Sequence, residues 1–277
     1  MNQKNQILSL LSAVVMLTTS CLKSPLEKPD VCSDPCRIAQ LNFTGISSGS
    51  HNIFTRYYDA RGWLAAISAR MGFPGSFGDY QLDVKYAGSY VFFIQQNSTD
   101  TAMKLLLDPF LRPLSYTTGA AFEHQRARYY YNYDGTLKKI ISEFNAGNGP
   151  TQDTTSYRYD WYGNVLSVAI TSPNVGRMDV VYTYDYTKPV AGIYYEPFIS
   201  TYMQPRLLLE YAGFVNVQPV HAIRSYVFYN SGYPVISLDY YNYAADNNQL
   251  ITGYTAGFWG KYSLQWNCDD RQKTVKY

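Results

Sequence analysis

The chain has 277 residues, 29 of them tyrosine, and aromatic residues make up 17% of the sequence. Its 23 basic and 21 acidic residues give a net charge of +2, and both signs are mixed along the chain. The pattern contains no basic block, which argues against nucleic acid as a partner, and no acidic tail. After the N-terminal segment, no stretch is long and apolar enough for a transmembrane helix, which needs about 20 residues.

Residues 1–20 are typical of an export signal. Lys4 supplies a positive start, an apolar run follows, and small residues precede Cys21. This segment resembles the lipobox of bacterial lipoproteins, although Leu17 lies one residue further from the cysteine than is usual. The resemblance implies that Cys21 is lipidated. Two or more acyl chains on this cysteine would anchor the protein stably to a membrane. The alternative is a secretory peptide cut near Ser20, with Cys21 left as a free thiol.

We interpret residues 21–37 as the lipidated cysteine and a proline-containing tether, and residues 38–277 as a single β domain. A cysteine near each end of this domain suggests a disulfide from Cys36 or Cys32 to Cys268, formed in an oxidising compartment. A local bridge between Cys32 and Cys36 is the alternative. No metal site or cofactor is predicted, because the cysteines form no second pair and the three histidines are scattered.

The stretch 129–170 contains two copies of one pattern, Tyr-x-Tyr-Asn/Asp-x-x-Gly-x-Leu/Val, which begin at Tyr129 and Tyr157. Aromatic residues at alternate positions place their side chains on one face of a β-strand. Asn132 and Asp160 are each followed three residues later by glycine. This spacing favours a turn, because the polar side chain caps backbone N–H groups and glycine adopts a positive φ cheaply. The unit is therefore a β-hairpin.

The hairpin unit recurs along the chain. Clear copies occupy residues 56–67, 182–193 and 226–232, and weaker copies, which keep the alternation but lose the Asp or the aromatic pair, occupy residues 82–93, 105–116 and 207–217. The predicted turn residues are Asp59, Gly62, Asn132, Gly135, Asp160, Gly163, Asp185 and Gly232.

The predicted fold class is all-β, an antiparallel up-and-down meander built from repeated hairpins. We expect about sixteen strands of roughly seven to nine residues, closed or nearly closed into a barrel. A short helix is expected near residues 33–40, after the start signal Ser33-Asp34-Pro35.

The repeated unit resembles the YD, or RHS-type, repeat, whose core is Tyr-x-Tyr-Asp-x-x-Gly-x-Leu. With its lipobox-like start, the chain is similar to a family of Bacteroidota lipoproteins that carry a YD-like domain of unknown function. The resemblance covers residues 50–265. It implies a porin-like β fold and an envelope lipoprotein of the outer membrane, with no assigned activity and no catalytic residues.

The acidic residues of the pattern each occupy the turn of their own repeat, so capping explains them better than a catalytic carboxylate pair does. These residues are Asp59, Asp134, Asp160 and Asp185. The three histidines lack a Ser or Cys nucleophile in a recognisable setting. We therefore expect no enzymatic activity.

The tyrosines are interpreted first as cross-strand ladders within the sheet, because most of them fall in the repeat frame. Alternatively, aromatic residues exposed at turns bind sugar rings, and the candidates are Trp161, Tyr162, Phe258 and Trp259. A transmembrane barrel is disfavoured, because Arg126, Arg128 and Arg158 interrupt the alternation that a lipid-facing wall needs.

Two strings, Asp100-Thr101-Ala102 and Asp153-Thr154-Thr155, resemble the O-glycosylation sequon of the same bacterial group. Both fall in predicted connections, so Thr101 and Thr154 are candidate acceptors.

Together these features predict a lipoprotein that is anchored to the outer membrane and has a structural or binding role in the cell envelope. Beyond the membrane itself, the candidate partners are a glycan or another envelope protein. The alternative function is the capture of a glycan or small ligand as a nutrient. The sequence leaves open which face of the membrane the protein occupies.

Overall fold

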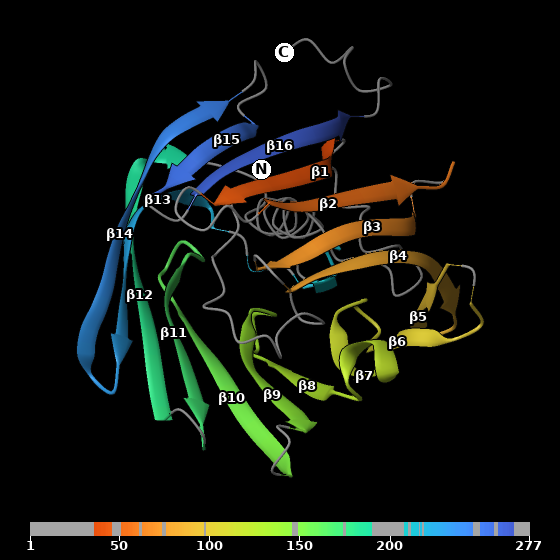
Figure 1. Cartoon of the computed structure of the whole chain (residues 1–277). Coiled ribbons are helices and arrows are strands. Elements are labelled where there is room, and N and C mark those ends of the chain that lie inside the picture. The colour runs from red at the N-terminus through yellow and green to blue at the C-terminus, as the bar shows by residue number, and fades with distance from the viewer. Residues whose placement is uncertain are drawn as a thin grey trace, which may run out of the picture.

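The computed structural model of the chain describes residues 36–45, 51–60, 63–73, 76–96, 98–145, 149–173, 176–189, 208–209, 212–215, 217, 219–245, 250–257 and 260–268. In these residues sixteen strands form one closed ring (Figure 1). The strands are β1 (Cys36–Gly45), β2 (His51–Tyr58), β3 (Leu64–Phe73), β4 (Ser76–Ala87), β5 (Tyr90–Gln95), β6 (Thr101–Leu107), β7 (Pro113–Thr118), β8 (Arg126–Tyr131), β9 (Leu137–Asn145), β10 (Pro150–Tyr159), β11 (Val165–Ser172), β12 (Gly176–Pro189), β13 (His221–Asn230), β14 (Tyr233–Ala245), β15 (Ile251–Ala256) and β16 (Gly260–Cys268). A short 3-10 helix, η1 (Ala120–Phe122), joins β7 to β8.

Each strand pairs in antiparallel fashion with its neighbours in sequence, and β1 pairs with β16 to close the barrel. The predicted all-β meander is therefore confirmed, and it is closed. At the seam, Cys36 lies directly opposite Cys268 in the register of the two strands. The side chains of both cysteines, like all of Cys32, lie outside the described residues, so the disulfide stays a prediction.

The short helix expected near residues 33–40 is wrong for the part that the structure describes. Residues 36–40 belong to β1, which is paired with β16 on one side and with β2 on the other. Pairing along both edges satisfies the backbone of this segment more fully than a marginal helix would, so tertiary context overrides the local start signal.

The two faces of the barrel wall differ in polarity. On β5, Val91 and Phe93 are fully buried and point inward, and similar residues line the other strands. On the outer face, Arg126 and Arg128 of β8 both pair with Glu143 of β9. A sixteen-stranded porin leaves an aqueous channel in its interior. The apolar lining here instead belongs to a packed core.

The segment between β12 and β13 contributes to this core. Its described residues lie within the ring of strands (Figure 1), where Leu208 and Leu209 are fully buried. The Phe214 ring packs edge-on against Phe93 of β5, with 5.7 Å between ring centroids. Gly213 lies beside the guanidinium of Arg56 on β2, so close that a Cβ at this glycine would be 3.4 Å from the Arg56 Nη1 atom. The barrel is thus filled by its own chain.

Two predicted hairpins, at residues 182–193 and 207–217, are therefore wrong. β12 runs without a reversal to Pro189, which pairs with His221 at the start of β13. The described residues of 207–217 pack inside the barrel and are not strands. Their alternating apolar pattern reflects burial, which a strand and an interior segment share.

Tyrosines on the inner face form a ladder across successive strands. Ring centroids are 5.8 Å apart for Tyr182 and Tyr226, 6.0 Å for Tyr226 and Tyr240, and 6.0 Å for Tyr240 and Tyr254. The ladder ends with Tyr262, whose ring lies 4.6 Å from Tyr254 and stacks nearly parallel to it. Cross-strand stacking thus explains these tyrosines, as the first interpretation proposed.

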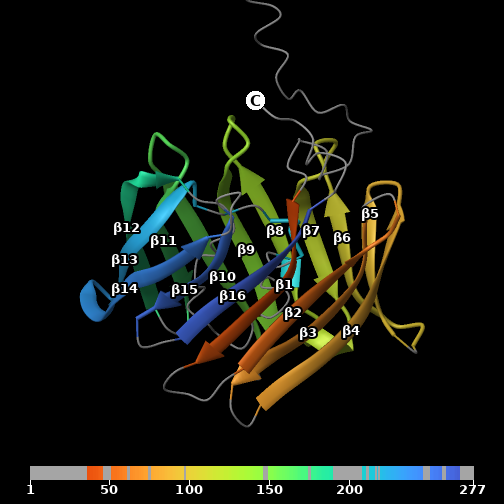
Figure 2. The ribbon, with the colours of Figure 1, turned by 90° about the horizontal axis from the view of Figure 1, so that it is seen from above.

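The barrel has two unlike rims. Because the strands alternate in direction, the turns after β2, β4, β6, β8 and β10 lie on one rim, together with the first residue of β1 and the last of β16. We call this the turn rim, and its hairpin turns can be followed along the upper edge of the wall in Figure 2. β12 and β14 also end at the turn rim, and the odd-numbered strands end at the opposite rim.

Candidate functional site

Four turns on the turn rim share one five-residue geometry. In each, the backbone N–H of the first residue donates to the carbonyl of the fifth, at 2.8 or 2.9 Å. The four pairs are Asp59 with Trp63, Asp108 with Arg112, Asn132 with Thr136, and Asp160 with Asn164. In the three turns that start with aspartate, the carboxylate also accepts the N–H of the fifth residue, which closes the turn.

In the three turns whose fourth residue is described, that residue has a positive φ. Gly135 and Gly163 adopt φ values of +86° and +90°, which confirms their predicted role. Gly62 lies outside the described residues. In the β6–β7 turn the same position is taken by Leu111, at φ +63°. Asp108 therefore fills the Asp slot of residues 105–116, which the sequence analysis counted among the copies that lose the Asp or the aromatic pair.

The tyrosine that precedes the turn links each repeat to the previous one. Tyr131 donates its hydroxyl to the carbonyl of Pro113, and Tyr159 donates to that of Leu137, both at 2.9 Å. Tyr184 donates in the same way to Val165. Pro113, Leu137 and Val165 are each the first residue after a turn, where the strand register shifts. The Tyr of the motif thus satisfies a carbonyl at an irregular point of the ladder.

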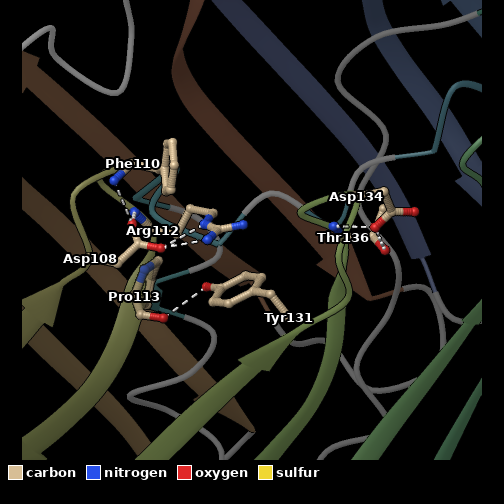
Figure 3. A network of polar contacts seen from close by, with 7 residues as sticks. All are labelled: Asp108, Phe110, Arg112, Pro113, Tyr131, Asp134 and Thr136. Atoms are coloured by element: carbon tan, nitrogen blue, oxygen red, sulfur yellow. Dashed lines mark hydrogen bonds and ion pairs between the residues drawn. The ribbon is translucent and has the colours of Figure 1, made fainter. Parts of the chain in front are cut away.

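Around the β6–β7 turn, charge and aromatic rings are tightly combined (Figure 3). The Arg112 guanidinium binds Asp108 Oδ2 at 2.7 Å and lies over the rings of Phe110 and Tyr131, at 5.1 and 4.5 Å from their centroids. A Cβ at Gly135 would be 3.1 Å from Arg112 Nη1. Burial raises the pKa of Tyr131, so its hydroxyl stays protonated and can donate to the backbone.

The β10–β11 turn has a further function, because it holds the end of the interior segment. Asn164 is fully buried, and its Oδ1 accepts the backbone N–H groups of Val220 and His221, each at 2.9 Å. Its Nδ2 lies 2.9 Å from Asp160 Oδ2 and 3.1 Å from His221 Nδ1. One side chain therefore joins a hairpin turn to the place where the chain leaves the interior.

Aromatic rings gather on the outer side of this turn. The rings of Tyr162, Tyr186 and His221 meet in pairs, with centroid distances of 5.3 to 5.4 Å. The Tyr186 hydroxyl donates to Asp160 Oδ2 at 3.0 Å. Tyr162 is thus held in place, yet 61% of its surface is exposed.

The second and third positions of neighbouring turns carry the most exposed aromatic residues of the turn rim. Trp161 is 96% exposed, Phe110 is 57% exposed, and Tyr133 is as exposed as in an extended peptide. With Tyr162 these form a set that we call the aromatic tips: Phe110, Tyr133, Trp161 and Tyr162. The sequence analysis had identified Trp161 and Tyr162. It missed Phe110 and Tyr133, although they occupy the third and the second position of their turns, as Tyr162 and Trp161 do in theirs.

Hydrogen bonds lower the pKa of two carboxylates on the rim. Bonds from the Thr136 hydroxyl and N–H lower the pKa of Asp134. Burial acts to raise the pKa of Asp160, but hydrogen bonds from Asn164, Tyr186 and the backbone together hold it below the ordinary value. Both oxygens of Asp160 are thereby engaged, which supports the capping interpretation over a catalytic one.

The remaining predicted turn residues lie elsewhere. Asp185 is not in a hairpin turn but within β12, where it accepts the N–H and hydroxyl of Thr187. Gly232 does form a turn with Ser231, both at positive φ, but on the opposite rim. Cys21, Phe258 and Trp259 lie outside the described residues.

The two candidate glycosylation sites are not in connections, contrary to expectation. Thr101 is the exposed first residue of β6, whereas Thr154 lies within β10 and is half-buried. Asp153, next to Thr154, is buried, and burial raises the pKa of its carboxyl. Since neighbouring residues of a strand point to opposite faces, the Asp and Thr of this string are not presented together.

Within the described part of the chain, no three His, Cys, Asp or Glu side chains are grouped as a metal site would require. A search of the same residues for a helix long and apolar enough to cross a membrane found none.

No protein-family model matches the chain, and no curated protein does so either. The fold is similar to that of a porin-like protein from Bacteroides uniformis ATCC 8492, with a TM-score of 0.59 and 12% identity over 84% of this chain and 98% of that one. It is also similar to a porin-like protein from Bacteroides vulgatus ATCC 8482, with a TM-score of 0.52 and 12% identity over 83% and 98%. The likeness shows the fold, so the expected porin-like fold is confirmed, and membership of the lipoprotein family stays a prediction.

Proposed function

We propose that this chain is a lipid-anchored protein of the outer membrane, with a structural or binding role and no catalytic activity. In this proposal the barrel lies beside the bilayer, and the lipid on Cys21 holds it there. The two solved structures named above are described as porin-like proteins of Bacteroides, which is consistent with an envelope location.

The observation that carries this proposal is the charge on the outer wall. Besides the pairs at Glu143, Arg177 binds Asp179 on β12 at 2.8 Å, and Arg70 of β3 faces Asp79 of β4 at 3.8 Å. A charged residue on the lipid-facing side of a membrane barrel costs about 2 to 4 kcal/mol near the midplane. These pairs lie at separate places around the wall, and Asp239, exposed at the middle of β14, adds a charge at mid-height. Such a wall favours a barrel surrounded by water.

The filled interior supports the same conclusion. A channel needs a polar lumen, whereas here Phe93, Leu208 and Leu209 occupy the inside of the ring. A barrel with a packed interior presents only its outer wall and its rims to partners. The binding surfaces are therefore sought on the rims.

Three measurements test the proposal. Mass spectrometry of the N-terminal peptide should find Cys21 modified by diacylglycerol, and Cys21→Ala should release the protein from the membrane fraction. Cys32→Ala is the matched control and should leave fractionation unchanged. Membrane association that persists in the Cys21→Ala variant would contradict the anchor, and ion conductance of the purified protein in planar bilayers would contradict the filled barrel.

A further inference from the structure

The aromatic tips are not required by the fold. The shared turn needs a capping side chain at its first residue and a positive φ at its fourth, and the second and third positions serve neither purpose. Nevertheless, three turns in a row, those after β6, β8 and β10, place an aromatic residue there. Apolar rings exposed together on one part of a surface commonly mark an interaction site. The aromatic tips therefore form a candidate interaction surface.

The position of the first residue of β1 indicates which surface lies close to the aromatic tips. β1 begins at Cys36 on the turn rim, the same rim that carries the tips. Fourteen residues lie between Cys21 and Cys36 in the sequence, so even at full extension they keep the lipid within about 50 Å of this rim. With a lipid on Cys21, the turn rim is the part of the barrel closest to the membrane, and the opposite rim faces away.

The chemistry around the rings favours a bilayer surface over a sugar. A sugar site needs hydrogen-bonding groups that converge on the ligand beside the ring. Next to Trp161 and Tyr162, however, both oxygens of Asp160 and both ends of the Asn164 amide are already bonded within the protein. Trp and Tyr are enriched at the membrane interface, where an apolar ring and a polar edge are both satisfied without a built pocket.

We infer that the aromatic tips insert into the headgroup region of the membrane that carries the lipid anchor, so that the barrel stands on its turn rim. The inference rests on the proposed anchor for its geometry. The charges beside the tips are the Asp108–Arg112 pair, the Asp185–Lys188 pair and the carboxylates of Asp134 and Asp160. Their sum is slightly acidic, so the surface suits zwitterionic lipid better than anionic lipid, and contact is insensitive to salt.

Fluorescence quenching tests this contact. The full lipidated chain is reconstituted in phosphatidylethanolamine and phosphatidylcholine vesicles whose acyl chains are brominated close to the headgroups. Emission from wild-type protein should be quenched relative to vesicles without bromine, and Trp161→Phe should remove that quenched component. The double variant Phe110→Ser, Tyr133→Ser should lose part of it, because fewer rings hold the rim against the bilayer.

The matched control is Tyr233→Ser, which removes an equally prominent exposed tyrosine from the opposite rim. This variant should be quenched like the wild type. Equal quenching of wild type and Trp161→Phe would overturn the inference. So would a Trp161 signal that ignores brominated lipid but responds to soluble maltohexaose, which would identify the tips as a sugar site. The anchor is tested separately by the mass of the N-terminal peptide, so an unmodified Cys21 with retained quenching would refute the anchor and support the tips.

Discussion

The turn at Asp160 and the segment at Asp185 begin alike and end differently. In both, the preceding tyrosine donates its hydroxyl to a carbonyl of the previous repeat, and the aspartate accepts the N–H of the residue two positions later. After Asp160 the chain reverses and forms β11, whereas after Asp185 it continues along β12 to Pro189. The Tyr-Asp pair thus attaches a repeat to its neighbour without deciding whether the chain turns.

The fourth and fifth positions make that decision. Gly163 adopts a φ of +90°, and the N–H of Asn164 closes the turn on Asp160 Oδ1 at 2.9 Å. The corresponding residues after Asp185 are Lys188 and Pro189, and proline has no N–H to donate. Leu111 occupies the fourth position of another turn, so glycine is replaceable there. After Asp185, therefore, neither a glycine at the fourth position nor an N–H at the fifth is available to close a turn.

The largest effect is expected from Asn164→Ala, which breaks the link between the Asp160 turn and the start of β13. The substitution removes the acceptor of two backbone N–H groups, at Val220 and His221, and the buried donor to Asp160. We expect a loss of about 3 kcal/mol in the free energy of unfolding, measured by urea denaturation, because each buried unsatisfied group costs about 1 to 3 kcal/mol.

The matched control for this prediction is Thr136→Ala at the same position of the β8–β9 turn. Thr136 bonds only within its own turn in the described contacts, so its loss should cost less than about 1 kcal/mol. Hydrogen exchange should also become faster at Val220 and His221 in Asn164→Ala and stay unchanged there in Thr136→Ala. Equal losses in the two variants would contradict the linking function of Asn164.

The structural features that depend on short stretches of sequence were predicted from those stretches. The hairpin unit, the strand order and the positive φ at Gly135 and Gly163 follow from residue spacing alone. The hairpin at residues 105–116 was predicted, but Asp108 was not identified as its turn residue, because Leu111 stands where the pattern has glycine. The hairpin predicted after Asp185 is absent, since Pro189 has no N–H to close a turn. The interior position of Leu208 depends on contacts with distant strands, which no short window of sequence contains.

An intermediate effect is expected from Gly163→Val, which tests the positive φ on one side of the comparison. A Cβ at this position meets only Val220 Cγ2, at 3.9 Å, so the cost comes from the backbone and not from crowding. A β-branched residue at φ +90° should destabilise the protein by more than about 1 kcal/mol in urea. Lys188→Gly should change stability by less than about 1 kcal/mol, because Pro189 still cannot close a turn. A neutral Gly163→Val would show that positive φ is not a constraint there.

The smallest expected effect distinguishes the two aspartates by their dependence on pH. Both have a folded pKa below the ordinary value, so each stabilises the protein above the unfolded pKa of about 3.9 and loses that contribution as pH falls through the lower folded value. The stability advantage of wild type over Asp160→Asn should therefore be present at neutral pH and vanish in acid, and likewise for Asp185→Asn.

Asp160 is held by neutral donors, whereas Asp185 also pairs with Lys188, at 3.4 Å. High salt should therefore reduce the advantage at Asp185 and preserve it at Asp160, since ions screen an exposed charge pair more than a hydrogen bond from a neutral group. Urea denaturation from neutral pH to below pH 3, at low and high salt, measures both advantages, and an equal response to salt would contradict this difference.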